Sequence, residues 1–562
     1  MEPGKEAMNT NPKVAVIGAG PAGMSAAYCL ARAGLATVDV YEASDSVGGL
    51  ARTIQLWNQK VDIGPHRFFS SDKRVNELWL EVAGRDYKMV NRLTRIYYKR
   101  KFYYYPLKAF NALFNLGIFQ ALLCVLSYGR QRIAPKPEDG SFESWVTRRF
   151  GKRLFRIFFK TYTEKLWGIP CEKLDSDFAA QRIKKLSLYE AIKNALFPSK
   201  ENKHKTLVDQ FAYPLGGTGA IYERMARFVE DKGGKVHLNT PVQKVIQGNG
   251  KATGLELENG QTHHYDHIIS TMPLTLMVSR LPGTPEQILD RTRKLKFRNT
   301  IIVFLNVDAV ELFPDQWLYV HSPELDTGRI TNFRNWIPEI YGEEKTTILA
   351  MELWCYDEDS IWSEDDAHLI AKASSEIRNT GLIGKAEILG GHVYRIPRCY
   401  PVYDTGYKEN LKPVEDYLSG IENLDYFCKL SGSRLSQSKL HDLLNECGLA
   451  NEVHQNRIET YSKGMRQKVG IAIALAKEAK VYLLDEPASG LDPLASNELS
   501  SLLKKLASNG AAILMASHDI FRVRETCDRI GIIKKGELVK EMNTSDVSTK
   551  ELENIYIDYI QN

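Results

Sequence analysis

The N-terminal part of this 562-residue chain alternates short apolar runs with a glycine turn and an amphipathic stretch. Residues 14–17 are apolar, as in a buried parallel strand, and they lead directly into the turn at residues 18–23. Helix-forming residues 24–33 follow, and a second apolar run at residues 37–41 ends at Glu42. This order predicts a β-strand, a turn, a helix and a second β-strand.

The spacing of the glycines in the turn favours a dinucleotide site over a purely structural turn. Gly18 permits a tight turn, Gly20 lets the backbone approach a pyrophosphate, and Gly23 lets the helix pack on the strand. The anion then lies at the positive end of the helix dipole. Glu42, about 20 residues further on, is placed to accept both hydroxyls of an unmodified ribose. The residues expected around the pyrophosphate are Gly18, Ala19, Gly20, Pro21, Ala22 and Gly23.

A second apolar stretch, residues 109–127, is at the short end of what crosses a bilayer and contains three polar amides. It predicts a buried or surface helix, with interfacial membrane contact as the alternative. The aromatic residues just before it predict a β-hairpin that turns at residues 99–101.

Composition limits the classes of function and of location. A length of 562 residues fits about three compact units. The balance of 74 Lys and Arg against 69 Asp and Glu does not predict a nucleic-acid partner. The eight cysteines form no CxxC pair, and residues 1–12 are polar, which predicts a loose tail and no signal peptide. We therefore expect a cytoplasmic protein, with the membrane periphery as the alternative.

The continuation of the chain carries a family resemblance. Residues 42–53, with the pair Gly48-Gly49 followed by Leu50 and Arg52, resemble the second signature of the superfamily of flavin amine oxidases, protoporphyrinogen oxidases and UDP-galactopyranose mutases. The resemblance implies an α/β fold, in which an FAD-binding Rossmann-like domain carries an inserted mixed α+β substrate domain. Gly49 and Leu50 would then lie at the FAD, and Arg52 would reach its diphosphate as a forked cation.

Further segments extend this resemblance to the substrate side. Residues 62–69 are similar to the segment that passes the flavin ring, which implies that His66 lies near the isoalloxazine, and Val242 is implied as the residue whose backbone holds the adenine. Arginines in the substrate segments could clamp a diphosphate or a carboxylate, although ordinary salt bridges are the alternative. The candidate residues of the substrate side are Arg182, Arg329, Arg334, Tyr400 and Tyr403. The resemblance implies an FAD-dependent oxidoreductase or a flavin-dependent mutase that acts on a small molecule such as a nucleotide-sugar.

The flavoprotein pattern ends abruptly at Leu424. We expect the FAD part at residues 13–80 and 205–275 and the substrate part at residues 81–204 and 276–400. The family's C-terminal strand and glycine turn, which should follow, are missing. Because that segment supplies backbone N–H groups to the cofactor, the sequence predicts weak or absent FAD retention.

Residues 425–562 resemble the C-terminal part of an ABC-transporter nucleotide-binding domain. The segment at residues 461–468 is a variant of the LSGGQ signature, and residues 481–487 predict a buried strand that ends in two carboxylates. The resemblance implies that Asp485 binds magnesium and that Glu486 is the base that positions the attacking water. The residues implied in ATP chemistry are Ser462, Gly464, Gln467, Asp485, Glu486, Asp492 and His518.

No GxxxxGK[ST] sequence occurs in the chain, so the phosphate cradle is missing. ATPase activity is therefore predicted to be absent, and ATP and Mg are implied by resemblance only. Three interpretations stay open. The chain is an FAD-dependent enzyme joined to an incomplete ATPase, an ATP-binding subunit of a transporter with an appended flavoprotein-like module and a membrane subunit as partner, or an inactive chimera.

Overall fold

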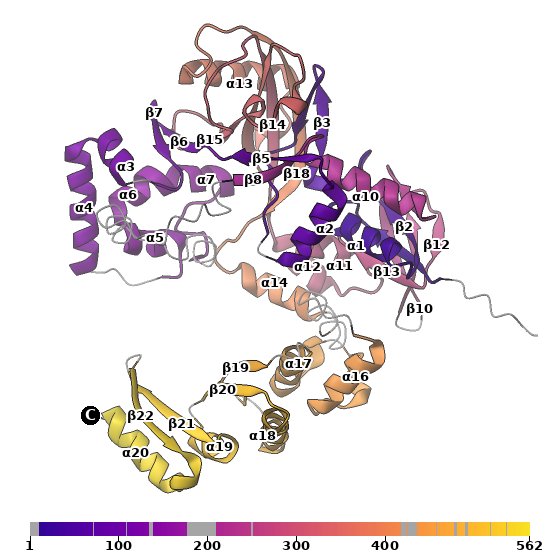
Figure 1. The fold of residues 1–562 in the computed structure, drawn as a ribbon, viewed down its shortest axis with the longest axis vertical. Helices are drawn as coiled ribbons and strands as arrows, with labels where there is room; N and C mark the ends of the chain where they lie inside the picture. Colours follow the sequence, from indigo (N-terminus) through magenta and orange to yellow (C-terminus); the bar gives the residue numbers. More distant parts are fainter. Residues whose placement is uncertain are drawn as a thin grey trace, which may run out of the picture. The chain divides into compact units, whose positions relative to one another are not determined.

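The computed structural model divides the chain into two compact units, Met1–Asn410 and Leu411–Asn562, which are described separately below (Figure 1). The helix α14 (Tyr407–Asp416) carries the chain across this division. The structure describes residues 11–70, 72–107, 109–133, 139–176, 210–248, 251–417, 424, 435–456, 458–476, 480–488, 493–517, 519–534 and 537–561.

The first unit begins with a parallel four-stranded sheet in the order β13-β1-β2-β9. This is the strand order of a doubly wound nucleotide-binding fold. The strands are β1 (Lys13–Ile17), β2 (Thr37–Tyr41), β9 (Lys235–His237) and β13 (His267–Ser270). The predicted strand, turn, helix and strand are confirmed. The helix α1 (Pro21–Arg32) begins three residues earlier than predicted, because Pro21 fits the first helical turn.

Both faces of this sheet are covered. Three helices pack on one face (Figure 1): α1, α2 (Lys73–Ala83) and α10 (Gly219–Asp231). An antiparallel three-stranded sheet covers the other face, through a core that includes Ile17, Tyr41 and Val242. Its strands are β10 (Val242–Gly248), β11 (Lys251–Leu257) and β12 (Thr262–His264).

A seven-stranded sheet in the order β18-β14-β17-β16-β15-β6-β7 forms the second layer of the first unit. Its central strands are buried on both faces, because alternate residues of β14 enter two different cores. The helix α13 (Asp366–Thr380) covers one face. The strands are β6 (Thr94–Tyr98), β7 (Lys101–Tyr104), β14 (Phe297–Val307), β15 (Trp317–Val320), β16 (Arg329–Asn332), β17 (Thr347–Cys355) and β18 (Ile388–Pro401).

Two short pairs of strands and two short helices complete the connections between the two sheets. The strand pairs are antiparallel. These elements are β3 (Thr53–Leu56) with β4 (Gln59–Asp62), β5 (Tyr87–Asn91) with β8 (Gln210–Pro214), α11 (Leu274–Ser279) and α12 (Glu286–Lys294).

A helical region packs beside strands β6 and β7, which form the predicted hairpin. The stretch predicted as one helix is two helices, because Gly117, with φ of 80°, interrupts it. Among the described residues, no helix is both long and apolar enough to cross a bilayer. The helices are α3 (Ala109–Leu116), α4 (Ile118–Ile133), α5 (Phe142–Phe150), α6 (Lys152–Phe155), the π-helix η2 (Arg156–Lys160) and α7 (Thr161–Trp167).

The second unit is built around a core that joins three helices to two parallel strands. A hairpin of two antiparallel strands and two further helices follow in the sequence. The elements are α16 (Gln437–Glu446), α17 (Lys463–Leu475), β19 (Val481–Asp485), α18 (Pro493–Ser508), β20 (Ala512–Ala516), α19 (Ile520–Thr526), β21 (Arg529–Lys534), β22 (Glu537–Asn543) and α20 (Thr549–Gln561).

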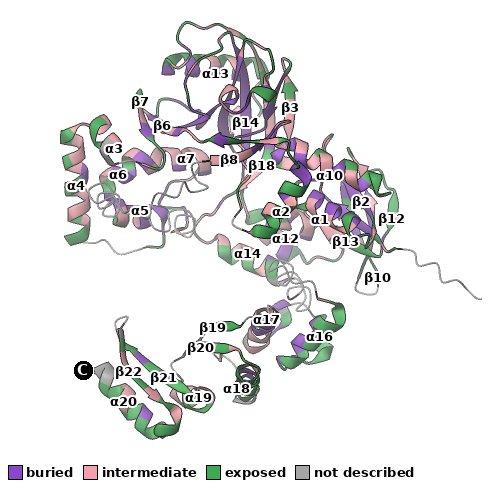
Figure 2. Ribbon diagram, in the orientation of Figure 1, coloured by how far each residue is buried: buried purple, intermediate pink, exposed green. Residues whose placement is uncertain are grey.

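The parallel pair β19 and β20 is less buried than the sequence predicts. Val481 is 59% exposed and Leu514 is 68% exposed, and Figure 2 shows exposed residues along β20. Parallel strands are normally covered on both faces and flanked by further strands. The expectation of a buried strand at residues 481–487 therefore holds for Tyr482, which is 7% exposed, but not for Val481. Among the described residues, β19 and β20 each pair only with the other.

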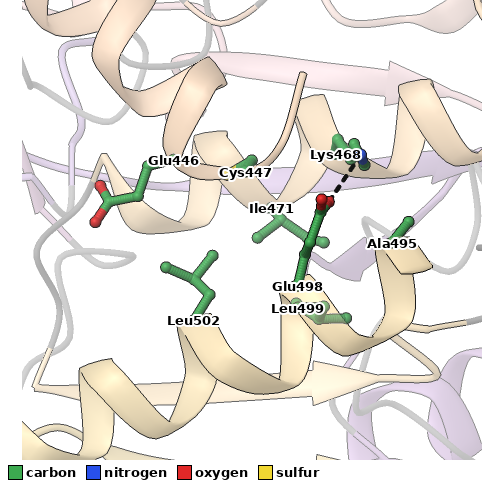
Figure 3. Close-up of a pocket in the computed structure, with 8 residues that line it drawn as sticks. All are labelled: Glu446, Cys447, Lys468, Ile471, Ala495, Glu498, Leu499 and Leu502. Atoms are coloured by element: carbon green, nitrogen blue, oxygen red, sulfur yellow. Dashed lines mark hydrogen bonds and ion pairs between the residues drawn. The ribbon is translucent and has the colours of Figure 1, made fainter. Parts of the chain in front are cut away.

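A small cavity of about 10 Å³ lies between α16, α17 and α18 in the second unit (Figure 3). Lys468 and Glu498 point toward each other at its edge, with 3.3 Å between Nζ and Oε2. Lys468 also donates to the Gly448 carbonyl at 2.6 Å. A space of this size holds one water molecule at most, so it is a packing defect and not a nucleotide site.

In the first unit, a buried carboxylate ties the hairpin of β3 and β4 to the start of α10. Asp62 is fully buried and accepts hydrogen bonds from the hydroxyls of Thr53, Tyr213 and Thr218 at 2.5 to 2.9 Å. It also accepts the Thr218 backbone N–H at 3.1 Å, while Gly219 N–H donates to Thr53. Burial raises the pKa of Asp62 to about 6, although the hydrogen bonds oppose this shift.

The raised pKa of Asp62 makes the stability of the first unit depend on pH in a defined direction. A carboxyl whose pKa is higher in the folded than in the unfolded state stabilises most below its unfolded value, here about 3.8, and this contribution is lost as the pH rises through about 6. We expect the difference in free energy of unfolding between wild type and Asp62→Asn to fall from about pH 4 to about pH 6 and then to stay constant. Urea denaturation across this range measures it.

The exposed Asp308 provides the control for this titration, because Asp308→Asn removes one carboxylate without touching the network. The difference between wild type and Asp308→Asn should be nearly flat over the same range. A wild-type profile parallel to that of Asp62→Asn would contradict the prediction.

Candidate functional site

The glycine turn between β1 and α1 has a geometry that only glycine allows. Gly18 has φ of 95°, and its N–H donates to the Tyr41 carbonyl at 2.7 Å. A Cβ on Gly23 would lie only 1.8 Å from the Gly18 carbonyl oxygen. Gly20 forms the N-cap of α1, and no side chain caps this helix. The turn therefore leaves the positive end of α1 without a side-chain acceptor, as an anion site requires.

The second glycine pair lies directly against this turn. Gly48 N–H donates to the Ala19 carbonyl at 2.8 Å, and a Cβ on Gly49 would lie 3.0 Å from the Gly20 Cα. Leu50, on the same loop, is 43% exposed. The two glycine segments predicted to hold one cofactor are thus in contact through their backbones, with the Pro21 side chain beside them.

Arg52 and Glu42 flank the turn with their own hydrogen bonds. Arg52 folds back onto its loop, where it donates to Ser46 at 3.0 Å and to Asp45 at 3.2 Å. The Glu42 carboxylate accepts Ala19 N–H at 2.7 Å, and its other oxygen accepts the Ser44 N–H at 2.9 Å. Oε1 also accepts the Ser44 hydroxyl at 2.7 Å, so Oε2 is the oxygen that retains capacity to accept a further hydroxyl. Through Oε2 the position fits the ribose role predicted for Glu42.

Val242 is 3% exposed at the start of β10, and it shares a core with Tyr41 of β2. The chain just before it returns to the glycine turn region, because Thr240 N–H donates to the Glu42 carbonyl at 2.8 Å. The structure therefore brings Val242 close in space to the end of β2.

His66 is half-buried and lies on the loop after β4. Its backbone N–H donates to the Gly64 carbonyl at 2.8 Å, and a Cβ on Gly64 would lie 3.0 Å from the ring. The ring Nδ1 is buried and has no hydrogen-bond partner among the described residues, and the same holds for Nη1 of Arg67. Burial, with a contribution from the charge of Arg329, lowers the pKa of His66 to about 4, so the imidazole is neutral at pH 7. Buried atoms without partners fit a site where a bound group supplies them.

Arg329 forms a buried ion pair with Glu352. The two residues are directly paired on β16 and β17, and Nε and Nη2 of the arginine donate to separate carboxylate oxygens at 2.7 and 2.5 Å. The side chains are 15% and 1% exposed. This geometry favours the salt-bridge alternative for Arg329 over a role as an anion clamp, because a bidentate carboxylate already neutralises the guanidinium.

An aromatic cluster surrounds this ion pair. Tyr162 stacks on His321 with ring centres 4.9 Å apart, and it meets Trp354 and Tyr319 edge to face. Burial raises the pKa of Tyr400 to about 12. Burial, with Lys165 nearby, lowers the pKa of His321 to about 3. Sequence reasoning selected only Tyr400 from this cluster, because the others carry no motif and meet only through the register of the sheet.

Of the two other predicted substrate residues that the structure describes, Tyr403 shares the Trp167 ring with Tyr400 of this cluster, whereas Arg334 makes its contacts elsewhere. Arg334 donates to the carbonyls of Glu344 and Thr346 at 2.8 Å, and its guanidinium lies over the ring of Tyr341. Tyr403 packs edge to face on Trp167, with ring centres 5.8 Å apart. Arg182 lies outside the described residues.

In the second unit, the predicted signature segment begins a helix. Ser462 forms the N-cap of α17, where its hydroxyl accepts Met465 N–H at 3.2 Å. Gly464 lies in the first turn of α17, and Gln467 donates to the Pro487 carbonyl at 3.2 Å. These contacts connect the signature helix to the end of β19.

Glu486 follows β19 with a backbone φ of 46°, which is rare for a residue other than glycine. Its N–H donates to the Ala516 carbonyl at 2.9 Å, and Ser517 donates to its carboxylate at 3.4 Å. Asp485 ends the strand as predicted, but its side chain, like Asp492 and His518, lies outside the described residues. Among the side chains that the structure describes, no group of three or more His, Cys, Asp and Glu could hold a metal ion.

Comparison with known proteins agrees with this geometry. Residues 21–382 match the profile of flavin containing amine oxidoreductases, and residues 384–489 match that of ABC transporters. The crystal structure of reduced UDP-galactopyranose mutase superposes with a TM-score of 0.62 at 20% identity, covering 86% of this chain and 98% of that chain. This likeness establishes the fold alone.

The C-terminal part resembles ATP-binding proteins. An uncharacterized ABC transporter ATP-binding protein of Bacillus subtilis (strain 168) is 38% identical over 128 residues, which are 23% of this chain and 41% of the relative. The bacitracin transport ATP-binding protein of Enterococcus faecalis is 35% identical over 160 residues, 26% of this chain and 51% of the relative. The chain therefore spans about half or less of the length of these relatives. With a family profile matching more than half of its length, the chain belongs to the flavin containing amine oxidoreductases, and part of an ABC transporter domain is fused to it.

Proposed function

We propose that this chain is an FAD-dependent enzyme that acts on a small molecule. The family implies FAD, and the observation that carries the proposal is the contact between the Gly48-Gly49 loop and the glycine turn at the start of α1. In this proposal the pyrophosphate lies at Gly20, Glu42 accepts the ribose hydroxyls and the Val242 backbone holds the adenine. Bound FAD supplies the redox chemistry, and the protein supplies orientation and electrostatics.

The substrate side supports an uncharged reacting group. His66 and His321 are neutral at pH 7, and Glu352 neutralises Arg329. The remaining members of the cluster are aromatic rings that offer apolar faces with hydroxyl edges. A sugar ring, as in a nucleotide-sugar, or an amine in its neutral form matches these surroundings. In this proposal the buried Nδ1 of His66 contacts the cofactor or the substrate, and burial, with a contribution from Arg329, keeps the imidazole neutral by lowering its pKa.

A single added methyl group tests the cofactor site. In Gly23→Ala the new Cβ meets the Gly18 carbonyl, so the turn must open and FAD affinity should fall by about tenfold or more. Gly129→Ala, at a helical glycine with no atom within 4 Å of the added Cβ, is the matched control and should bind as wild type does. The measurement is titration of the flavin-free protein with FAD, followed by visible absorbance and flavin fluorescence.

The same titration tests separately whether the proposed cofactor site exists and whether the replaced C-terminal segment matters for FAD affinity. We expect wild-type protein to bind FAD reversibly and weakly, because the family's C-terminal segment is replaced beyond residue 424. Absence of saturable binding would overturn the proposed cofactor site. Stoichiometric FAD retained through purification would support the proposed cofactor site, and it would refute the expectation that tight FAD binding requires the replaced segment.

We also propose that the C-terminal unit does not hydrolyse ATP on its own. Ser462 at the start of α17 and Glu486 at the end of β19 favour descent from an ATP-binding subunit, which would bind ATP with Mg and a membrane partner. Relatives named for bacitracin and lantibiotic transport suggest the kind of transporter to which such a partner would belong. Without a GxxxxGK[ST] sequence, however, the β- and γ-phosphates lack a cradle.

This second proposal predicts equal phosphate release by wild type and Glu486→Gln in the presence of ATP and magnesium. The substitution keeps the size of the side chain and removes the carboxylate that would position water. A malachite-green assay at several protein concentrations also detects activity that requires association. Turnover by wild type that Glu486→Gln abolishes would refute the proposal.

A further inference from the structure

The helices α3 and α4 carry a large apolar surface that none of the described residues of the first unit covers. Phe114 is 82% exposed, Ile118 is 83% exposed and Phe119 is 73% exposed. Figure 2 shows mainly exposed and intermediate residues along α4, which lies at the outer edge of its unit in Figure 1. The exposed apolar side chains of the two helices are Leu113, Phe114, Ile118, Phe119, Leu122, Val125, Leu126 and Ile133. Contiguous apolar patches of this kind mark interaction sites.

The exposed side chains follow helical spacing. Ile118, Leu122 and Val125 recur at intervals of three and four residues, so they share one face of α4. Cys124, on the opposite face, is 3% exposed and belongs to the core of the helical region. The inner side of α4 therefore packs in the core of the helical region, whereas the apolar outer face makes no contribution to that core.

The chain around this face is strongly and uniformly basic. Residues 87–137 contain ten Lys and Arg and no Asp or Glu, although the chain as a whole is nearly balanced. Three of these cations, Lys99, Arg100 and Lys101, form the tip of the hairpin of β6 and β7. Arg130 and Arg132 lie in the last turns of α4. Two of the ten cations, Lys88 and Arg95, are paired with carboxylates from other segments. The cations at the hairpin tip and at the end of α4, beside an apolar face, match an anionic surface.

A groove of about 420 Å³ lies between the hairpin and these helices. Lys101 donates to the Asn115 carbonyl at 2.6 Å and Arg153 donates to Gln120 at 2.7 Å, which fixes both cations at the wall of the groove. The groove is lined by Tyr98, Lys99, Lys101, Tyr103, Asn115, Leu116, Gln120, Arg153, Arg156 and Ile157. Its four cations and two tyrosines suit a phosphate group bordered by apolar chains.

We propose that the outer face of α3 and α4, together with the hairpin tip, docks on the surface of a bilayer that contains anionic phospholipids. Phe114, Ile118 and Phe119 enter the interfacial layer, and the cations meet headgroup phosphates. The helices are 8 and 16 residues long, so they lie in the interface and do not cross the bilayer. A second copy of the chain is a poorer occupant, because a twofold contact would bring the cations of the hairpin tip and of the end of α4 close to their own copies. This inference is independent of the proposed enzymatic function.

Vesicle co-sedimentation tests this docking. Wild type should sediment with vesicles of phosphatidylcholine containing about one third phosphatidylglycerol, and binding should weaken with salt and with pure phosphatidylcholine. The double variant Phe114→Ser/Phe119→Ser should lose about tenfold or more in partitioning, since two exposed aromatic side chains no longer enter the interface. Lys99→Ser/Arg100→Ser should lose binding to anionic vesicles selectively.

The control is Leu35→Ser/Leu389→Ser, which removes two apolar side chains that are each 55% exposed elsewhere on the first unit. It should bind vesicles as wild type does. Because all the substituted side chains are exposed, circular dichroism melting should show unchanged folding for every variant. Failure of wild type to bind anionic vesicles, or equal loss in the control, would overturn the proposal. Light scattering that shows a dimer which only Phe114→Ser/Phe119→Ser disrupts, without vesicle binding, would assign the face to a second copy instead.

Discussion

The close approach of α1 to the turn before it is the constraint on which the first unit depends. Gly23 lies against the Gly18 carbonyl so tightly that no side chain could be added, and this contact sets the direction in which α1 leaves the sheet. The second glycine pair then packs on the same turn, and the loop from β4 carries His66. The proposed cofactor site and the loop of His66 thus depend on close backbone contacts at glycines, where an added side chain would not fit.

The sequence predicted the elements whose signals are local. The β-α-β order at residues 14–53, the hairpin at residues 99–101 and the strand with Glu486 after it follow from periodicity and turn residues, and the structure contains each of them. The α/β class with an ABC-like part at the end is likewise confirmed. Boundaries were less accurate, because capping decides them. Pro21 starts α1 three residues before the predicted position. Gly117 divides an apolar stretch, residues 109–127, whose hydrophobicity predicts one continuous helix.

The substrate layer could not be predicted because its contacts span large sequence separations. Arg329 and Glu352 meet only because β16 and β17 are in register, and Tyr162 reaches His321 from a separate helix. The Asp62 network, likewise, joins side chains from four places in the chain. Thr53 and Asp62 lie in segments that carry a family resemblance, but nothing in the sequence indicates that these side chains meet. Such clusters form when whole helices and strands pack together. A hydrophobic pattern predicts which face of an element is buried, but it does not predict which other element that face contacts. Resemblance selected the arginines Arg329 and Arg334 equally, whereas their contacts differ completely.

The short parallel sheet of the C-terminal unit has a practical consequence for handling the protein. Among the described residues, β19 and β20 each keep one side without a partner strand, and Leu514 faces outward beside that open edge. Open edges with apolar side chains recruit strands from other molecules. Self-association at high concentration should therefore begin in the C-terminal unit. The flavoprotein-like unit would enter the aggregate only because it is covalently joined to that unit.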